Sequence, residues 1–344
     1  MSESSEPKDA RGSAAGPHLL LVVGNSRSGT SVLARALGLH DDLVDLGETH
    51  FADELLPAGP VDELLRGNDA RTFADSLQER LAFGLHGQRG GTIRSGLVLP
   101  NELTAPIDLF LEVAAFQMDS AAGHLIEQTP GHLYHARRIL DASSKASVVM
   151  IVRDPRAVVY SNCKRWRAAR RWAKSPSAYL EVVRSWAQGH SVLQSLLWRR
   201  GARAGLALER DYPDRVTRIT YEDLIGDAET SLRSICAAIG VDFQPSMLDV
   251  DVQGSSSSPN DPGARGFQAR SSTPAELRLR DGAHRIVESL CDVEMQALGY
   301  DRTGRGSLAS IGVEALTLPK VAIGVLISVS RMDSIKESLK ERLS

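Results

Sequence analysis

The stretch that decides the fold is "LLLVVGNSRSGTSVLARALG", residues 19–38. It begins with a continuous apolar run, which is typical of a parallel strand buried on both faces of a sheet. A short loop of small and polar residues starts at Gly24, and a helical apolar pattern follows Gly29. In this arrangement the N–H groups of the loop and the positive end of the helix dipole face one point. The stretch therefore predicts a site for a phosphate-bearing anion.

The loop departs from the common nucleoside-triphosphate loop, which reads GxxxxGK[ST]. Gly24 and Gly29 have the matching spacing, but Thr30 stands where the Lys belongs. The cation of this loop is Arg27, three residues earlier. The missing Lys disfavours a kinase or an ATPase, and a tight turn without a ligand is the structural alternative.

The rest of the chain alternates between strand and helix patterns. Alternation of this kind predicts a parallel α/β sheet with helices on both faces. The strands are expected at 18–24, 147–153 and 216–222, with a weaker one at 124–128, and the helices at 30–38, 103–121, 132–141, 155–173, 177–204, 228–239 and 274–297.

The chain is expected to form one main domain over residues 18–303, after a disordered tail at 1–17. Residues 52–122 are expected to form a helical insert after the first βα unit, where the substrate binds. An apolar and amphipathic helical extension follows at 304–344. Its apolar run, 321–330, is interpreted as a packed terminal helix, with a homodimer contact or a peripheral membrane contact as alternatives.

Composition excludes several classes of protein. The 344 residues are 42% hydrophobic and 24% charged with a formal net charge of −3, as in an ordinary globular protein. This charge argues against nucleic-acid binding, so the basic run 164–174 is interpreted as a rim for an anionic cofactor or acceptor. No apolar run reaches the roughly 18 residues of a membrane span. Three widely spaced cysteines show no disulfide or metal pattern, which predicts a cytoplasmic location.

A second motif, "SVVMIVRDPRAVVYSNCKRW" at 147–166, again joins a strand to a helix. Arg153 leaves the carboxyl end of the strand, where ligands bind in open α/β sheets. Asp154 is a natural N-cap and Pro155 suits the first helical position, so Ser161 lies about two turns into the helix. A guanidinium and a hydroxyl can therefore meet one phosphate. A salt bridge at the sheet edge is the plain alternative for Arg153.

The two motifs together resemble those of the sulfotransferases that use 3′-phosphoadenosine 5′-phosphosulfate (PAPS). "RSGTS" (27–31) is similar to the family's 5′-phosphosulfate loop, and 147–166 is similar to its 3′-phosphate motif. A strand followed by "YEDL" within 215–241, and "MQALGYD" at 295–301, are also typical. The resemblance is to bacterial-type members and to tyrosylprotein and carbohydrate sulfotransferases. It implies a P-loop-like α/β fold and sulfuryl transfer to a hydroxyl group.

The resemblance also implies the cofactor and its site. PAPS would be the cofactor and PAP the product, with no metal required. Tyr221 would contact the adenine, and Arg265 and Arg270 of the polar loop 253–273 would cover the 3′-phosphate, although a core tyrosine and solvated arginines are the alternatives. The implied cofactor-binding residues are Arg27, Ser28, Gly29, Thr30, Ser31, Arg153, Ser161, Tyr221, Arg265 and Arg270.

Sulfuryl transfer needs a cation at the leaving oxygens and a base for the acceptor hydroxyl. Arg27 fits the first role by its place in the loop. Glu48, in "DLVDLGETHFADELL" (42–56), follows Arg27 by 21 residues and resembles the base of the tyrosylprotein sulfotransferases. His50 is its nearest rival, since cytosolic members of the superfamily use His. The remaining alternatives are a solvated carboxylate at 48, or His132 or His124 as the base.

One position departs from the family pattern. Relatives often carry Lys in an EKTP-like stretch, and this chain has Gln128 in "EQTP" (127–130). The expected acceptor is a small-molecule, sugar or lipid-linked alcohol. The rival hypotheses are a nucleotide-dependent small-molecule kinase and a non-catalytic module that binds PAP or another anion.

Overall fold

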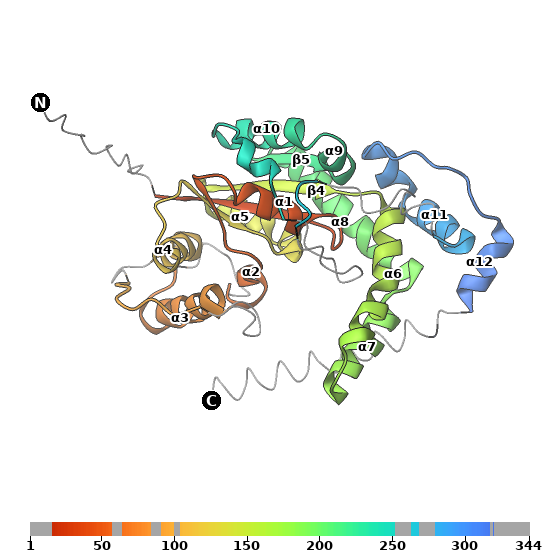
Figure 1. Ribbon diagram of the computed structural model, residues 1–344, viewed down its shortest axis with the longest axis horizontal. Coiled ribbons are helices and arrows are strands. Elements are labelled where there is room, and N and C mark those ends of the chain that lie inside the picture. Colours follow the sequence, from red (N-terminus) through yellow and green to blue (C-terminus); the bar gives the residue numbers. More distant parts are fainter. Residues whose placement is uncertain are drawn as a thin grey trace, which may run out of the picture.

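The structure is a computed structural model. It describes residues 16–56, 64–83, 91–99, 104–251, 263–267, 279–316 and 319. Its centre is a sheet of five parallel strands in the order β2-β3-β1-β4-β5 (Figure 1). The strands are β1 (His18–Gly24), β2 (Leu43–Asp45), β3 (His124–Glu127), β4 (Ala146–Val152) and β5 (Val216–Thr220). The predicted parallel α/β sheet is confirmed.

The apolar run of the opening stretch forms the central strand β1. Residues 19–23 are fully buried, because β1 is flanked by β3 and β4 and covered on both faces. In the register, Leu21 lies beside Glu127 of β3 and Gly24 lies beside Ile151 of β4. The end of β1 is thus nearly level with the end of β4, and β1 extends three residues beyond its pairing with the end of β3.

Helices cover both faces of the sheet. Leu19, Leu21 and Val23 point into a core shared with α4, α5, α8 and α11, whereas Leu20 and Val22 point into a core shared with α1 and α10. Side chains alternate between faces along a strand, so one apolar run serves both cores. The helices are α1 (Thr30–Leu37), α4 (Pro106–Met118), α5 (Ala136–Ala142), α8 (Ser191–Asp211), α10 (Ala228–Ile239) and α11 (Asp281–Ala297).

The helical insert lies between β2 and β3 and forms a separate group below the sheet in Figure 1. It contains α2 (Phe51–Glu54), α3 (Gly67–Phe83) and α4. The rings of Phe51 and Phe110, 4.2 Å apart between centroids, pack α2 on α4. Strand β2 was not predicted, because three residues are too few for a periodic pattern to stand out.

The helix expected at 177–204 is two helices, α7 (Pro176–Gln188) and α8. They separate at Gly189, where a Cβ would lie 3.2 Å from the backbone of Cys163 in α6 (Pro155–Trp172). His190 then caps α8, since its ring accepts a hydrogen bond from the Val192 N–H at 3.1 Å. Helices α6 and α7 pack together and extend away from the sheet (Figure 1).

The described chain ends with α11 and then α12 (Leu308–Ala315), which begins the predicted extension. The strand expected at 216–222 ends two residues early, at Thr220, and a short helix, α9 (Tyr221–Gly226), begins there. The tail expected at 1–17 lies outside the described residues except for 16 and 17, and so does the run 321–330. Among the helices described, none has the length and apolar character needed to cross a membrane.

Candidate active site

The strands end at one edge of the sheet, and four predicted site segments follow them. Parallel strands place their carboxyl ends together, which is where open α/β sheets bind ligands. The loop that carries Arg27 follows β1, Arg153 follows β4, and Tyr221 follows β5. Glu48 comes three residues after β2. The topology therefore brings segments that are far apart in the sequence to one edge.

The loop after β1 has an unusual backbone. Arg27 has a φ of 76° and Gly29 a φ of 103°, both in the left-handed region. At Gly29 a Cβ would lie 2.6 Å from the Tyr221 ring, so only glycine fits. Ser28 is fully buried, and its hydroxyl has no hydrogen-bond partner among the described residues. A buried hydroxyl without a partner beside a helix N-terminus suits an anionic ligand.

Arg27 is joined to the second motif by two hydrogen bonds. Its Nε donates to the Ser161 hydroxyl at 3.1 Å, and its carbonyl accepts from Arg153 Nη1 at 3.1 Å. The N-cap predicted for α6 is present, because Asp154 accepts from the Arg156 N–H at 2.8 Å. The structure thus brings Arg27, Arg153 and Ser161 together.

Tyr221 completes this group. The Arg153 guanidinium lies over the Tyr221 ring, 3.9 Å from its centroid, in a cation–π contact. The Nε of Arg153 is buried without a hydrogen-bond partner in the part of the chain described. On the other side, the Trp198 indole donates to the Arg153 carbonyl at 3.0 Å and fixes the backbone. Tyr221 is half-buried and packs against the core that contains Leu20 and Val22.

A second group lies at the ends of β2 and β3. The Gln128 amide donates from Nε2 to Glu48 Oε1 at 3.1 Å, and His50 Nε2 lies 3.6 Å from Glu48 Oε2. The Gln128 N–H donates to the carbonyl of Gly47 at 3.1 Å, which ties the two strand ends together. Glu48, His50 and Gln128 are therefore neighbours.

The electrostatics of this second group separate the two rival bases. Hydrogen bonds to Asp53 and then to Glu48 raise the pKa of His50 to about 10. Asp53 in turn contacts both His135 and His50, which lower its pKa. At neutral pH His50 is therefore an imidazolium, which has no lone pair to accept a proton. Glu48 is the stronger candidate for the base.

Comparison with known proteins shows the family of this chain. The model of the sulfotransferase family matches residues 18–245, which is more than half of the chain. The chain belongs to the sulfotransferase family. The rat protein sulfotransferase 2A1 (Rattus norvegicus) is 32% identical over 114 residues. This match covers 33% of the chain and spans 38% of the length of the rat protein.

Solved structures of other sulfotransferases are also similar. The sulfotransferase domain from the curacin biosynthetic pathway is 16% identical, with a TM-score of 0.46, over 83% of this chain and 98% of its own. The sulfotransferase STF9 from Mycobacterium avium is 14% identical, with a TM-score of 0.46, over 85% of this chain and 79% of its own.

The other cofactor-binding residues predicted for this sulfotransferase-family protein differ in burial and in their contacts. Thr30 is buried at the first position of α1, and Ser31 beside it is exposed. Arg265 is 56% exposed and pairs with Asp249 at 2.9 Å and with Asp251 at 3.5 Å. Arg270 lies outside the described residues.

The two weaker candidates for the base differ from Glu48 in position or burial. His124 begins β3 and so lies at the opposite, amino edge of the sheet. His132 is fully buried, with Nδ1 2.6 Å from Glu127 Oε2. Its Nε2 accepts a hydrogen bond from the Ala52 N–H at 3.3 Å.

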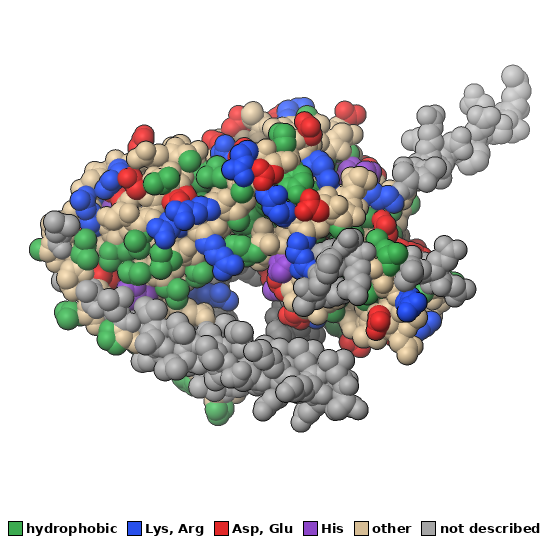
Figure 2. All heavy atoms as spheres, turned by 180° about the vertical axis from the view of Figure 1, so that it is seen from behind, with side chains coloured by type: hydrophobic (Ala, Val, Ile, Leu, Met, Phe, Trp, Pro, Cys, Tyr) green, Lys and Arg blue, Asp and Glu red, His purple; other side chains and the backbone are tan. Residues whose placement is uncertain are grey.

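The surface is hollowed beside this edge. Seen from behind, a hollow separates the part of the molecule that contains α6 and α11 from the part that contains the insert (Figure 2). Lys, Arg and His side chains lie beside the hollow. The basic run 164–174 lies on α6, and its described arginines are exposed.

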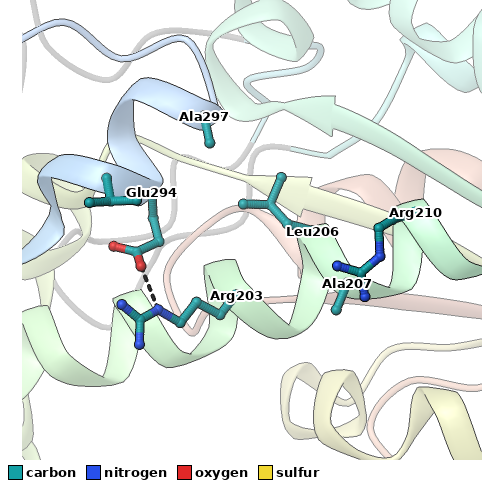
Figure 3. A pocket seen from close by; sticks show the side chains of 7 residues that line it. Arg203, Leu206, Ala207, Arg210, Glu294 and Ala297 are labelled. Atoms are coloured by element: carbon teal, nitrogen blue, oxygen red, sulfur yellow. Dashed lines mark hydrogen bonds and ion pairs between the residues drawn. The ribbon is translucent and has the colours of Figure 1, made fainter.

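A separate pocket of about 320 Å³ lies between α8 and α11 (Figure 3). Arg203 and Glu294 form an ion pair at one end, and Leu206 and Ala207 line the wall. Within α8, Trp198 lies near the carboxyl edge of the sheet, where it contacts Arg153. From there the helix runs toward the start of β5. The pocket therefore lies toward the amino edge, and none of the predicted site residues lines it.

Several site residues were not found from the sequence. Asp53 raises the pKa of His50, His135 pairs with Asp53, and Trp198 holds the Arg153 backbone. Glu127, the last residue of β3, is fully buried beside Glu48's loop. An acidic residue at the end of an apolar strand was the available signal for Glu127, whereas the others show no local pattern.

Proposed function

We propose that this protein is a PAPS-dependent O-sulfotransferase that transfers a sulfuryl group to an alcohol. The observation that carries the proposal is the joining of Arg27, Ser161 and Arg153 by hydrogen bonds of 3.1 Å. Membership of the sulfotransferase family supports it. The partnerless Ser28 hydroxyl and Arg153 Nε among the described residues add donors that an anionic cofactor can use.

When bound, PAPS supplies the sulfuryl group. The loop Arg27–Ser31 would hold the 5′ end of PAPS through backbone N–H groups and hydroxyls. Arg153 and Ser161 would bind the 3′-phosphate, and Tyr221 would contact the adenine. Arg265 would have to exchange its contacts with Asp249 and Asp251 to reach the cofactor.

The chemistry of the proposed reaction rests on charge and on one proton. Arg27 stabilises the negative charge that develops on the leaving oxygens. Glu48 accepts the proton of the acceptor hydroxyl. The Gln128 amide, which donates to Glu48 Oε1, orients the Glu48 carboxylate. Gln128 brings no charge where relatives often have Lys, and the His50 imidazolium 3.6 Å from Glu48 supplies positive charge nearby.

The insert is the proposed binding surface for the acceptor. It contacts the loop of Glu48 directly, because Arg80 of α3 donates to the Thr49 carbonyl at 2.8 Å and pairs with Glu54. A small-molecule, sugar or lipid-linked alcohol would reach Glu48 from this side. The apolar run of segment 304–344 remains proposed as a packed terminal helix, with a dimer or membrane contact as the alternatives. The location remains proposed as cytoplasmic, with peripheral attachment to the membrane as the alternative.

The cofactor assignment is tested by Arg153→Ala. Loss of a charged hydrogen bond costs about 1.5–3 kcal/mol, so PAP affinity should fall about 10- to 150-fold in calorimetry. Arg233→Ala, which removes an exposed arginine that pairs with Glu229 on α10, should bind PAP normally. Unchanged affinity in the Arg153 variant, or tighter binding of ATP than of PAP by the wild type, would contradict the assignment.

The base is tested by Glu48→Gln, which keeps the shape but cannot accept the proton. The value of kcat should fall by about 10²–10⁴, with PAP affinity almost unchanged. His50→Asn should retain far more activity. A dead His50 variant beside an active Glu48 variant would move the base to His50. PAP binding without any sulfate turnover in the wild type would favour a non-catalytic module.

A further inference from the structure

Glu127 is a carboxylate with no contact to solvent. It is 0% exposed and ends β3, directly before Gln128. Its Oε1 accepts from the Thr49 N–H at 3.0 Å, the Thr49 hydroxyl at 2.9 Å and the Thr129 hydroxyl at 2.6 Å. Its Oε2 accepts from the Thr129 N–H at 3.0 Å and lies 2.6 Å from His132 Nδ1. Every partner lies in a segment that borders the proposed base.

The charge of Glu127 is retained despite its burial. Burial by itself raises the pKa of this carboxyl, but His132 and the hydrogen bonds from Thr129 and Thr49 outweigh burial and lower it. Buried ion pairs contribute little to stability, and well-packed apolar residues often replace them without loss. Stability is therefore a poor reason for a buried carboxylate at this place.

The contacts of Glu127 converge on the segment that carries Glu48 and His50. Thr49, the residue between them, is bound through both its N–H and its hydroxyl. The Thr129 hydroxyl, while it donates to Glu127, accepts from the His50 N–H at 3.1 Å. His132 accepts from the Ala52 N–H at 3.3 Å. One carboxylate thus anchors residues 49, 50 and 52.

This anchoring holds a conformation that the backbone would otherwise leave. His50 has a φ of 52°, a left-handed value that is strained for a residue other than glycine. The hydrogen bond from its N–H to Thr129 holds it there. In that position the His50 ring lies between Glu48 and Asp53.

We infer that Glu127 is a positioning residue of the reaction, which acts through Thr49 and Thr129 to hold Glu48 and His50 in place. The inference deepens the proposed function and rests on it for the role of Glu48. Glu127 is sealed from solvent, so it does not touch the acceptor. Glu127 fixes the position of Glu48, the proposed base.

The direct variant, Glu127→Gln, presents an amide to several donors and can fail to fold, so Thr129 gives the sharper test. Thr129→Val removes the hydroxyl at nearly constant volume, and Thr129→Ser keeps it. A small misplacement of a reacting group costs up to about 10²-fold in rate. We expect kcat of Thr129→Val to fall about 10- to 100-fold, with PAP affinity within twofold of wild type and most activity restored in Thr129→Ser.

A second readout does not depend on activity. The His50 ring faces Glu48, Asp53 and the His132 ring, whose centroid is 6.5 Å away. Titration of this ring by NMR should move to lower pH in Thr129→Val, because His50 loses its place between the two carboxylates. Thr129→Ser should titrate like the wild type.

The outcomes separate the two hypotheses. A folded Thr129→Val variant with lower thermal stability but normal kcat and an unmoved His50 titration would overturn the positioning role. A wild type that binds no PAP would overturn the proposed function instead, and the NMR titration would still decide whether the Glu127 network holds His50.

Discussion

Arg27 and His50 share a backbone feature at the scale of single residues. They are two of the three described residues other than glycine with a positive φ, and the third is Asp119. Such conformations cost about 1–3 kcal/mol each and persist where surrounding contacts hold them. Arg153 holds the Arg27 carbonyl, and Thr129 holds the His50 N–H. Both strained residues belong to the proposed site, one on the cofactor side and one beside the base.

The charge of His50 makes stability depend on pH. Its pKa is about 10 in the folded protein against an ordinary value of 6.5. Because folding raises this pKa, the stabilisation is fully present below pH 6.5 and is lost as the pH rises toward 10. We expect the free energy of unfolding of wild type and of His50→Asn to converge between pH 7 and pH 10 in urea titrations.

Asn is the matched replacement, since it tolerates a left-handed backbone. A stability difference between the two proteins that stays constant across this pH range would show that His50 is not held as an imidazolium.

At the scale of elements, helix α6 carries the cofactor-side hydroxyl, and its first turn is anchored from outside the sheet. Arg156 pairs with Asp154 and donates to Glu288 of α11 at 2.9 Å. Glu288 also accepts from the Thr303 N–H at 2.8 Å and hydroxyl at 3.0 Å. Burial raises the pKa of Glu288, but these hydrogen bonds outweigh it and lower the pKa overall. Helix α11 therefore helps to set where α6 presents Ser161 to Arg27.

Glu288→Gln tests this anchor. The change leaves the buried Arg156 with Asp154 as its carboxylate partner and with the Asp301 carbonyl, so the free energy of unfolding should fall by about 1–3 kcal/mol in urea denaturation. The control variant, Glu229→Gln, changes the exposed Arg233–Glu229 pair and should lower the free energy of unfolding by only about 0.2–0.5 kcal/mol. Equal losses in the two variants would mean that the buried pair does not anchor α6. The difference between wild type and Glu288→Gln should shrink as pH falls through the acid range, where the lowered carboxyl is protonated.

At the scale of the whole molecule, the strand order divides the proposed site in two. The central strand β1 presents the phosphate loop, with β4 and β5 on one side and β3 and β2 on the other. Arg153 and Tyr221 follow the strands of the first side, and Glu48 and Gln128 follow those of the second. The helices of the insert and the pair α6 and α7 extend from these two sides (Figure 1). Cofactor and acceptor would thus approach the central loop from opposite sides.

The sequence by itself determined the α/β fold, the family and the two strand-to-helix motifs around Arg27 and Arg153. These are local patterns, because an apolar run, a glycine-containing turn and an N-cap are each encoded within a few neighbouring residues. The same patterns predicted Asp154 as a helix cap, which the structure confirms. The topology of parallel strands then brought the motifs to one edge without further information.

Only the tertiary structure decided the short strand β2, the break between α7 and α8, and the charge of His50. Strand β2 has three residues, and its place depends on pairing with β3. The break at Gly189 depends on the backbone of α6 lying close by. The proton on His50 depends on Asp53, Glu48 and a loop held from Glu127, 78 residues after Thr49. Such features arise from contacts between distant segments. A pKa depends on the charges that the fold places beside the titrating group, and no local sequence pattern encodes those charges.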